Sequence, residues 1–357
     1  MKFEWKTLHV LVLGALLALL PTVADAAAPK EIRVGYPGVG VGNRPAAGGN
    51  SVATMHLRGL LEDEFKKDGI TIRWTFLRGA GPATNELYAN NLLDFSLLGD
   101  LPSIIGRSGG LNTRLLAGQS VRGNIYLSVP ADSPVKTVQE LRGKRVAVAK
   151  GTATHLAAGK ILEQFGLTEK DVRLINMETN VATAAIVTGD IDAAFGGSNW
   201  LGLRDQGVAR VIFRTTGGDP KLTSNSTFIG SEEFIRKYPE ITQRVVNTVV
   251  LAAKWLADQS DKPEAVYQLW TRTGFTYASY KEDWSNESMK YKTSPLIDPY
   301  LVARYSFQIT EAKRLGLIRQ TFDFRDWVEP KFLEAALREL QLEGLWQPRN
   351  EEGVPKS

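Results

Sequence analysis

Cysteine is absent from this chain of 357 residues. Its absence excludes disulfide bonds, cysteine-ligated metals, cysteine nucleophiles and a lipid-modified cysteine behind a leader sequence. Histidine is also scarce, because only His9, His56 and His155 occur. These isolated histidines do not supply the clustered ligands of a zinc site. We therefore expect no metal and no cofactor, and a fold that depends on an ordinary hydrophobic core.

The chain also lacks a block of like charge. It carries 43 Lys and Arg against 39 Asp and Glu, a formal net charge of +4 at pH 7, and the two signs are interspersed. Proteins that bind nucleic acids usually gather basic residues on one patch or stripe. The dispersed charge is typical of a solvated surface, and we expect no nucleic-acid partner.

Long hydrophobic runs are missing except near the start, where Leu8 to Leu20 is almost unbroken Leu, Val and Ala. Two lysines precede this run, and Ala24-Asp25-Ala26 follows it. Together these features indicate a secretory signal peptide over residues 1–26. The alternative is a retained membrane anchor, but such a helix usually needs ~20 apolar residues. We expect cleavage before Ala27 and export of the mature chain.

Short apolar strands alternate with helical stretches from Glu31 to Thr216, which is typical of α/β units with parallel strands. The expected strands cover residues 31–36, 71–76, 94–98, 113–117, 125–129, 145–149, 172–175, 192–195 and 210–213. The expected helices cover residues 53–67, 82–90, 138–142 and 154–165. Beyond Ser231 the pattern becomes mainly helical, with stripes such as Ile241, Val245, Val249, Ala252 and Leu256.

A mature chain of about 330 residues exceeds one typical domain, so two domains are expected. Two stretches, Leu93 to Asp100 and Ile191 to Ser198, each lead through an apolar strand into a turn of glycine and a polar residue. If each stretch belongs to one of two similar α/β lobes that face each other, both turns would lie at one cleft.

The segment Lys150 to His155 follows an expected strand and opens an expected helix. The hydroxyls of Thr152 and Thr154, with the free N–H groups of a helix start, would suit an anion. The alternative is that one of these threonines only caps the helix. His155 is more often a packing residue than a ligand contact at such a position.

A similar turn occurs at Gly99 to Ser103, where Asp100 either caps the next helix or lines the cleft. Its counterpart in the second lobe is Ser198-Asn199-Trp200, in which Trp200 is either core or the wall of a ligand site.

Two stretches of the sequence partly resemble enzyme motifs but do not match them. The glycine-rich stretch Gly38 to Gly42 matches neither the dinucleotide fingerprint nor the P-loop. The segment Gly106 to Gly110 formally fits the hydrolase elbow, but a helix ends there and a strand follows, which is the reverse of what the elbow requires. We expect no catalytic residues.

Several stretches together resemble a known family. They are Ile32 to Tyr36, the joint Leu93 to Pro102, the string Val129 to Gly151 and the segment Lys150 to His155. These segments look like those of the aliphatic-sulfonate, taurine and nitrate substrate-binding proteins of ABC importers. The resemblance implies the type II periplasmic binding protein fold, in which two α/β lobes are joined by two crossover strands. It also implies an oxyanion ligand held at helix starts.

By motif position, the resemblance implies ligand contacts at Gly99, Asp100, Leu101, Gly151, Thr152 and Thr154. Positions beside the cleft and the hinge add Asn124, Ser198, Asn199, Trp200 and Asn225. We expect one lobe from residues 31–123 plus 228–345 and the other from residues 124–227, with hinges at 124–128 and 223–228. The chain departs from the family in its glycine-rich stretch Val39 to Asn50 and in having Ser198-Asn199-Trp200 where Trp-Asp-Pro is common. Both segments should face the cleft.

The resemblance implies a monomeric periplasmic protein without enzymatic activity. It would capture a small organic anion, an aliphatic sulfonate above all, by hinge closure and deliver it to an ABC permease in the inner membrane. Three alternatives remain: nitrate, bicarbonate or a pyrimidine-like compound as the ligand, an enzyme of the related pyrimidine-synthesis fold, or a sensor that presents its ligand to a membrane receptor. The enzyme would need a cofactor lysine and catalytic His or Cys groups.

Overall fold

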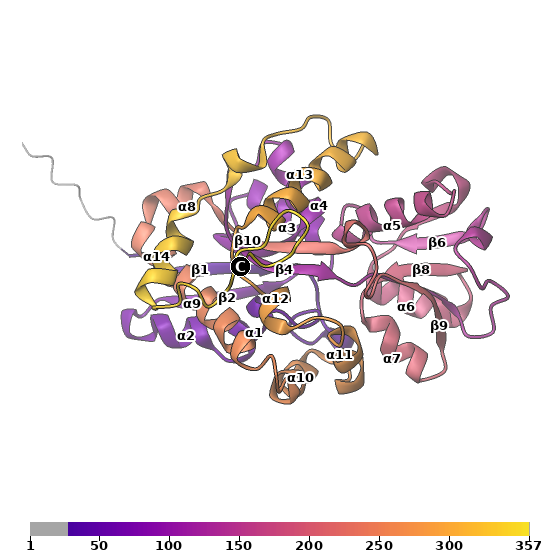
Figure 1. Ribbon diagram of the computed structural model, residues 1–357, viewed down its shortest axis with the longest axis horizontal. Helices are drawn as coiled ribbons and strands as arrows, with labels where there is room; N and C mark the ends of the chain where they lie inside the picture. Colours follow the sequence, from indigo (N-terminus) through magenta and orange to yellow (C-terminus); the bar gives the residue numbers. More distant parts are fainter. Residues whose placement is uncertain (1–27, 357) are drawn as a thin grey trace, which may run out of the picture.

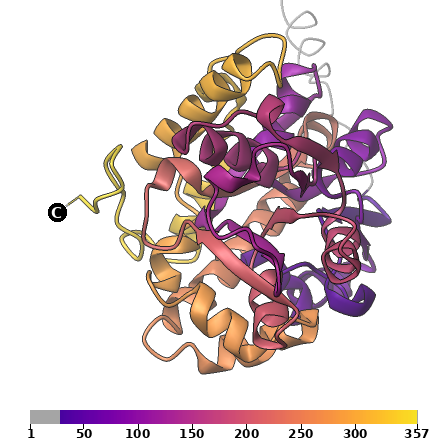
Figure 2. The same ribbon diagram turned by 90° about the vertical axis from the view of Figure 1, so that its right-hand side faces the viewer.

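The computed structural model describes residues 28–356, so the predicted signal peptide at residues 1–26 lies outside the described residues. Figure 1 shows two lobes side by side, each built around one sheet with helices on both faces, and Figure 2 turns the lobe that carries β6 and β8 toward the viewer. Between residues 28 and 356, no helix has the length and apolar character needed to cross a membrane.

The first sheet has five strands in the order β2-β1-β3-β10-β4. Their bounds are β1 Glu31–Tyr36, β2 Thr71–Phe76, β3 Phe95–Gly99, β4 Thr113–Gly123 and β10 Ser224–Ser231. Strand β1 runs parallel to β2 and β3, with Val34 opposite Trp74 on one side and Phe95 on the other. Strand β10 runs antiparallel to both β3 and β4.

The second sheet also has five strands, in the order β7-β6-β8-β5-β9. Their bounds are β5 Tyr126–Pro130, β6 Arg145–Val148, β7 Arg173–Asn176, β8 Ala193–Gly196 and β9 Ala209–Arg214. Strand β6 is parallel to β7 and β8, whereas β5 is antiparallel to β8 and β9. The two sheets therefore repeat one plan, three parallel strands followed by an antiparallel pair.

Strands β5 and β10 run antiparallel to their neighbours and so depart from the predicted parallel α/β units. The chain leaves the first sheet at the end of β4 and returns to it in β10 from the same edge, so β10 must run in the opposite direction. A parallel return would need a crossover of a dozen or more residues across the sheet. The links between the sheets are residues 124–125 and 215–223.

Helices cover both sheets. Those before β5 and after β10 are α1 Ser51–Leu57, α2 Leu60–Phe65, α3 Ala80–Ala89, α4 Asp100–Ser108, α8 Glu232–Lys237, α9 Pro239–Asp258, α10 Glu264–Trp270, α11 Tyr277–Asp283, α12 Met289–Lys292, α13 Pro299–Arg314 and α14 Lys331–Glu339. Those between β6 and β9 are α5 Ala153–Gln164, α6 Thr179–Thr188 and α7 Asn199–Asp205. Short 3-10 turns occupy Val41–Asn43, Lys66–Asp68, Gln139–Leu141, Glu169–Asp171, Pro220–Leu222, Thr271–Thr273 and Phe324–Trp327.

Two expected helices differ from the structure. The one expected over residues 53–67 is divided between α1 and α2, because Gly59 adopts a left-handed backbone (φ 67°) that ends the first helix. The one expected over residues 138–142 is a single 3-10 turn, Gln139–Leu141, with only Leu141 buried.

Each sheet has a hydrophobic core on both faces, because successive side chains of a strand point to opposite sides. In β10, Phe228 joins the core under α1, α9 and α14, whereas Ile229 joins the core formed by α4, α13 and Trp327. In β5, Leu127 and Tyr126 divide in the same way between the two cores of the second lobe. The stripe expected after Ser231 is confirmed in α9, where Val245, Val249, Ala252 and Leu256 are fully buried.

Candidate functional site

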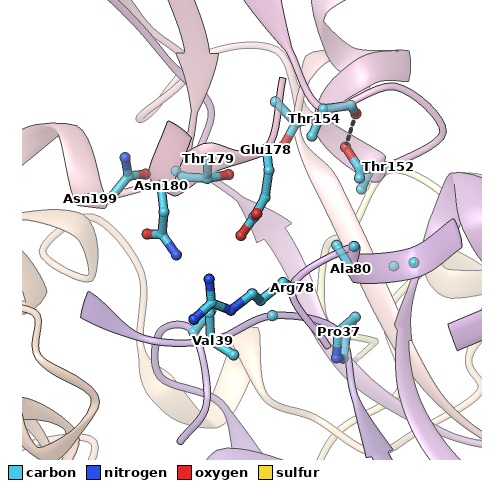
Figure 3. A pocket seen from close by; sticks show the side chains of 18 of the residues that line it. Pro37, Val39, Arg78, Ala80, Thr152, Thr154, Glu178, Thr179, Asn180 and Asn199 are labelled. Atoms are coloured by element: carbon cyan, nitrogen blue, oxygen red, sulfur yellow. Dashed lines mark hydrogen bonds between the residues drawn. The ribbon is translucent and has the colours of Figure 1, made fainter. Parts of the chain in front are cut away.

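A cavity of about 530 Å³ lies where the ends of both sheets meet, a volume in the range of small-molecule sites. Figure 3 shows side chains that line it. From the first sheet and its loops it takes Pro37, Gly38, Val39, Ala47, Gly48, Arg78, Gly79, Ala80, Gly81, Pro82, Gly99, Pro102 and Phe275. From the second lobe it takes Ala149, Lys150, Thr152, Ala153, Thr154, Asn176, Glu178, Thr179, Asn180, Phe195, Gly197, Ser198 and Asn199.

Four helices of nine to twelve residues, α3, α4, α5 and α6, begin at the wall of this cavity. None of their N-cap residues makes a side-chain capping bond. In α4, however, the carboxylate of Asp100 accepts the first-turn N–H of Leu101 at 2.8 Å, so the helix starts open to a ligand are those of α3, α5 and α6. Such N–H groups have no partner within the helix, and they carry the positive end of its dipole. The wall therefore favours a negatively charged ligand.

Local topology explains why these helix starts converge. In a parallel strand-helix unit the helix begins just beyond the carboxyl end of its strand, so neighbouring units present their helix starts at the same edge of the sheet. Helix α3 follows β2, α4 follows β3, α5 follows β6 and α6 follows β7. Each lobe thus contributes two starts to one cavity.

Three charged side chains lie in the lining, Arg78 and Lys150 with positive charge and Glu178 with negative charge. Arg78 donates a hydrogen bond from Nη2 to Oδ1 of Asn43, at 2.7 Å, in the glycine-rich stretch. In Figure 3, Arg78 from the first lobe and Glu178 from the second point toward one another across the cavity.

Five of the eleven residues proposed from the sequence lie in the lining: Gly99, Thr152, Thr154, Ser198 and Asn199. Their contact with a ligand stays a prediction. The Thr152 hydroxyl donates to the carbonyl oxygen of Ala149 at 2.6 Å, so its proton is already used within its own turn. Nδ2 of Asn199 is buried and has no hydrogen-bond partner among residues 28–356.

The other six lie outside the lining. Leu101 and Trp200 are fully buried core residues. Gly151 adopts φ 76°, and its N–H donates to Nδ1 of His155 at 3.1 Å. Asn124 donates from Nδ2 to the backbone carbonyl (2.8 Å) and side chain (3.0 Å) of Asp283, which holds the first link between the sheets.

The remaining two, Asp100 and Asn225, contact each other. Asp100 is fully buried, and its carboxylate accepts hydrogen bonds from the backbone N–H (2.9 Å) and Nδ2 (3.2 Å) of Asn225. It also accepts from the N–H of Leu101 at 2.8 Å and from Nε2 of Gln308 at 3.1 Å. Burial raises the pKa of the Asp100 carboxyl, and the positive charge of Lys160 opposes that rise.

The structure thus puts Asp100 outside the lining of the cavity, while its carboxylate does bond a first-turn N–H of α4, that of Leu101. The N-cap of α4 is Gly99, and Asp100 is the first residue inside the helix. Its carboxylate joins α4 to β10 and α13, behind the cavity wall rather than in it.

Replacing Asp100 with asparagine should lower the free energy of unfolding by about 2 kcal/mol, because the new amide would oppose buried donors with a donor of its own. Urea unfolding followed by circular dichroism measures this change. The exposed Asp132 offers a matched control, since Asp132→Asn should change stability by less than about 0.5 kcal/mol. Equal stabilities for the two variants would contradict the structural role of Asp100.

The sequence analysis missed Arg78, Lys150, Glu178 and Phe275 as candidates. Lys150 belongs to the segment Lys150 to His155, in which only the threonines were considered as anion contacts. Arg78 has the equivalent position in the first lobe, between a strand and the helix that follows it. Position after a strand was therefore an available signal for Arg78. Nothing in the sequence marked Phe275, which reaches the cavity through tertiary packing alone.

The glycine-rich stretch does face the cavity, as expected, through Val39, Ala47 and Gly48. It lies close to the turn at residues 270–275. A Cβ on Gly40 would lie 2.0 Å from the carbonyl oxygen of Thr273, so only glycine fits there. This approach fixes the shape of one cavity wall.

Within residues 28–356, no three His, Cys, Asp or Glu side chains come together in a way that could hold a metal ion. The chemistry available in the lining is hydrogen bonding and charge. Helix N–H groups, two cations, hydroxyls and three asparagine amides can surround an anion, and the apolar side chains of Val39, Phe195 and Phe275 can contact the organic part of a ligand.

Comparison with known proteins places these features in context. Residues 65–264 match the family described as NMT1/THI5 like. A Bacillus subtilis protein named for binding aliphatic sulfonates is 29% identical over 212 residues, which is 59% of this chain. The match spans 63% of that relative, less than two thirds of its length.

Solved structures share the fold. A protein from Methylobacillus flagellatus, described as the periplasmic sulfonate-binding protein SsuA, superposes with a TM-score of 0.74 at 29% identity, over 90% of this chain and 98% of that one. The expected two-lobed periplasmic binding protein fold is therefore confirmed. The desulfurization enzyme DSZB has the same fold, with a TM-score of 0.63 and 20% identity over 87% of this chain and 99% of that one, so the fold alone does not separate binding from catalysis.

Proposed function

The chain belongs to the NMT1/THI5-like family, and from that premise we propose that it is a periplasmic binding protein of an ABC importer that captures an organic sulfonate. The observation that carries this proposal is the convergence of three helix starts without side-chain caps, those of α3, α5 and α6, and two cations on one interlobe cavity. A sulfonate has three acceptor oxygens and one negative charge, so it can use donors from several directions.

A binding role is favoured over catalysis by the side chains at the cavity. Acid-base or nucleophilic catalysis usually relies on groups such as His or Cys. Among the described residues, the lining contains no histidine, and the sequence has no cysteine. Within residues 28–356, the lining thus lacks histidine and cysteine, two of the side chains on which such catalysis most often depends.

Capture would proceed by closure of the lobes over the ligand. Within residues 28–356, the two sheets are linked by residues 124–125 and 215–223 alone, which is typical of a hinge. Because the whole of β10 pairs in the first sheet, we place the end of the second lobe before Ser224 rather than at residue 227. The proposal includes three further points. Residues 1–26 are removed as a signal peptide, the mature protein is a monomer, and it delivers its ligand to an inner-membrane permease.

A thermal unfolding screen tests the ligand class. A sulfonate at 100 times its dissociation constant should stabilise the protein by about 2.7 kcal/mol, which corresponds to a rise of roughly 5–10 °C in the melting temperature. Butane-1-sulfonate and 3-aminopropane-1-sulfonate are compared with nitrate, bicarbonate and uracil. Stabilisation by one of these three rivals, with none by any sulfonate, would overturn the assignment.

Among the hydroxyls of the lining, Thr154 should matter more than Thr152, because the Thr152 proton is held by Ala149. Thr154→Val should weaken sulfonate binding about tenfold, the loss expected for one hydrogen bond to a charged acceptor. Thr152→Val is the matched control and should change affinity less than threefold. Titration calorimetry of both variants measures the difference, and the reverse ranking would contradict this placement of donors.

A further inference from the structure

Two arginines make ion pairs between the lobes. Arg204, on α7 of the second lobe, donates from Nη1 and Nη2 to the two carboxylate oxygens of Glu282 on α11, at 2.7 and 2.6 Å. Arg314, at the end of α13 in the first lobe, donates in the same way to Glu163 on α5, at 2.9 and 2.6 Å. In Figure 1, α7 and α11 lie on one side of the strands that join the lobes, and α5 and α13 lie on the other. Each side of the boundary between the lobes therefore has one bidentate ion pair.

Each of these arginines is also held by a carboxylate of its own helix. Asp205 accepts from Nε and Nη2 of Arg204, at 2.9 and 2.7 Å. Glu311 accepts from Nη2 of Arg314 at 2.7 Å. The guanidinium groups are thus oriented within their own lobes, so less side-chain entropy is lost when they pair with the other lobe. The loss of that entropy is one reason why exposed ion pairs often contribute little.

Three of the helices that carry these pairs also form the cavity wall. Helix α7 begins at Asn199 and α5 begins at Ala153, and both residues line the cavity. Helix α11 begins shortly after Phe275, which is a third lining residue. The four paired side chains themselves lie outside the lining. Ion pairs between these helices can therefore hold the cavity walls together without touching a ligand.

The end of α11 carries further contacts to the second lobe. Arg214, the last residue of β9, donates to Oε1 of Glu282 at 3.2 Å. The hydrogen bond from Arg204 lowers the pKa of the Glu282 carboxyl, so this residue is ionised at neutral pH. The adjacent Asp283 accepts from Asn124 in the first link. Glu282 thus faces two cations of the second lobe close to the hinge.

We propose that the two interlobe ion pairs hold the lobes together over the cavity, and that Glu282 and Glu163 are positioning residues that raise the affinity for every ligand without contacting it. This inference goes beyond the proposed function, because it concerns the equilibrium between the lobes and applies to any ligand class. When a ligand binds only the closed arrangement, its apparent affinity falls in proportion to the population of that arrangement. Weakening the pairs should therefore lower all affinities by one common factor.

Glu282→Gln and Glu163→Gln each remove one interlobe charge. Titration calorimetry with butane-1-sulfonate and 3-aminopropane-1-sulfonate should show a loss of about threefold in each variant, the size expected for an exposed ion pair. The two pairs share no residue, so their effects should multiply to about tenfold in the double variant. Small-angle X-ray scattering should give the ligand-free double variant a larger radius of gyration than the wild-type protein, a change that a role in stability alone would not produce.

Glu64→Gln is the matched control, because Glu64 pairs with Arg244 at 2.6 Å within the first lobe and at similar exposure. It should lower the melting temperature as much as Glu282→Gln does and leave both affinities and the radius of gyration unaltered. Unchanged affinities in the double variant, losses that differ between the two sulfonates, or an unchanged radius of gyration would overturn the inference. If neither sulfonate binds the wild-type protein, the proposed function falls, and the scattering comparison still decides the inference.

Discussion

Replacement of Arg349 by alanine should lower the free energy of unfolding by about 3–5 kcal/mol, the cost of leaving a buried charge without its partner. The Arg349 side chain is 2% exposed and that of its partner Asp298 is 1% exposed. Arg349 donates from Nε to Oδ2 of Asp298 at 2.6 Å and from Nη2 to Oδ1 at 3.2 Å. Its guanidinium also lies over the rings of Tyr291 and Tyr300, at 4.9 and 5.0 Å from their centroids.

This ion pair fixes the end of the chain on the first lobe. Asp298 also caps α13, because its Oδ1 accepts from the N–H of Leu301 at 3.0 Å. Removing Arg349 would leave the Asp298 carboxylate buried, with its charge uncompensated by any guanidinium. The loss should therefore reach α13 as well as the terminal segment.

Urea unfolding followed by circular dichroism measures this loss. Arg73→Ala is the matched control, because Arg73 pairs with Glu31 at 3.0 Å on the surface, with side chains 50% and 39% exposed. An exposed pair of this kind contributes less than about 1 kcal/mol. If Arg349→Ala costs no more than Arg73→Ala, the buried pair does not stabilise the fold as described.

Reversal of the charge at Arg78 should reduce sulfonate affinity at least about 100-fold, or 2.7 kcal/mol. Arg78 is an exposed residue of the cavity wall, held by Asn43 and directed toward the space between the lobes. Arg78→Glu removes a charge-assisted donor and places a second carboxylate opposite Glu178. Arg78→Ala should have a smaller effect, about tenfold, because it removes the donor without adding repulsion.

The control for Arg78 is Arg73→Glu, on strand β2 just before the loop that carries Arg78, and outside the lining. It changes the net charge identically and should alter affinity less than threefold. The Arg78 variants should also keep the melting temperature of the ligand-free protein, because the side chain is exposed. Similar losses of affinity at positions 73 and 78 would indicate a general charge effect and would contradict a specific contact.

The sequence predicted the fold well where periodicity and strand ends were decisive. Strands β1 and β2 were predicted with the bounds that the structure has, because each is a short segment in which polar and apolar residues alternate. Gly59 shows the limit of this reasoning, since its left-handed backbone divides a pattern that appeared continuous. The antiparallel direction of β5 and β10 depends on where the chain re-enters each sheet, which local patterns do not encode.

The candidate site was predictable only in part. Turns after strands pointed to Thr152, Thr154 and Ser198, because helix starts in parallel units lie at one edge. Asp100 also follows a strand and begins a helix, but its carboxylate is hydrogen-bonded to Asn225 and Gln308. These residues are distant in sequence, so local patterns did not predict the contact. Arg78 and Glu178 come from different lobes and lie on opposite sides of the cavity. Their relative position depends on how the two lobes face each other, which local sequence patterns do not predict.

Titration calorimetry of the purified mature protein with 3-aminopropane-1-sulfonate and butane-1-sulfonate tests the central claim most directly. The account predicts saturable binding of at least one of them, with one site per chain and with binding at least 100-fold weaker in Arg78→Glu. Absence of saturable binding for both sulfonates, in a sample shown to be folded and free of bound ligand, would contradict it.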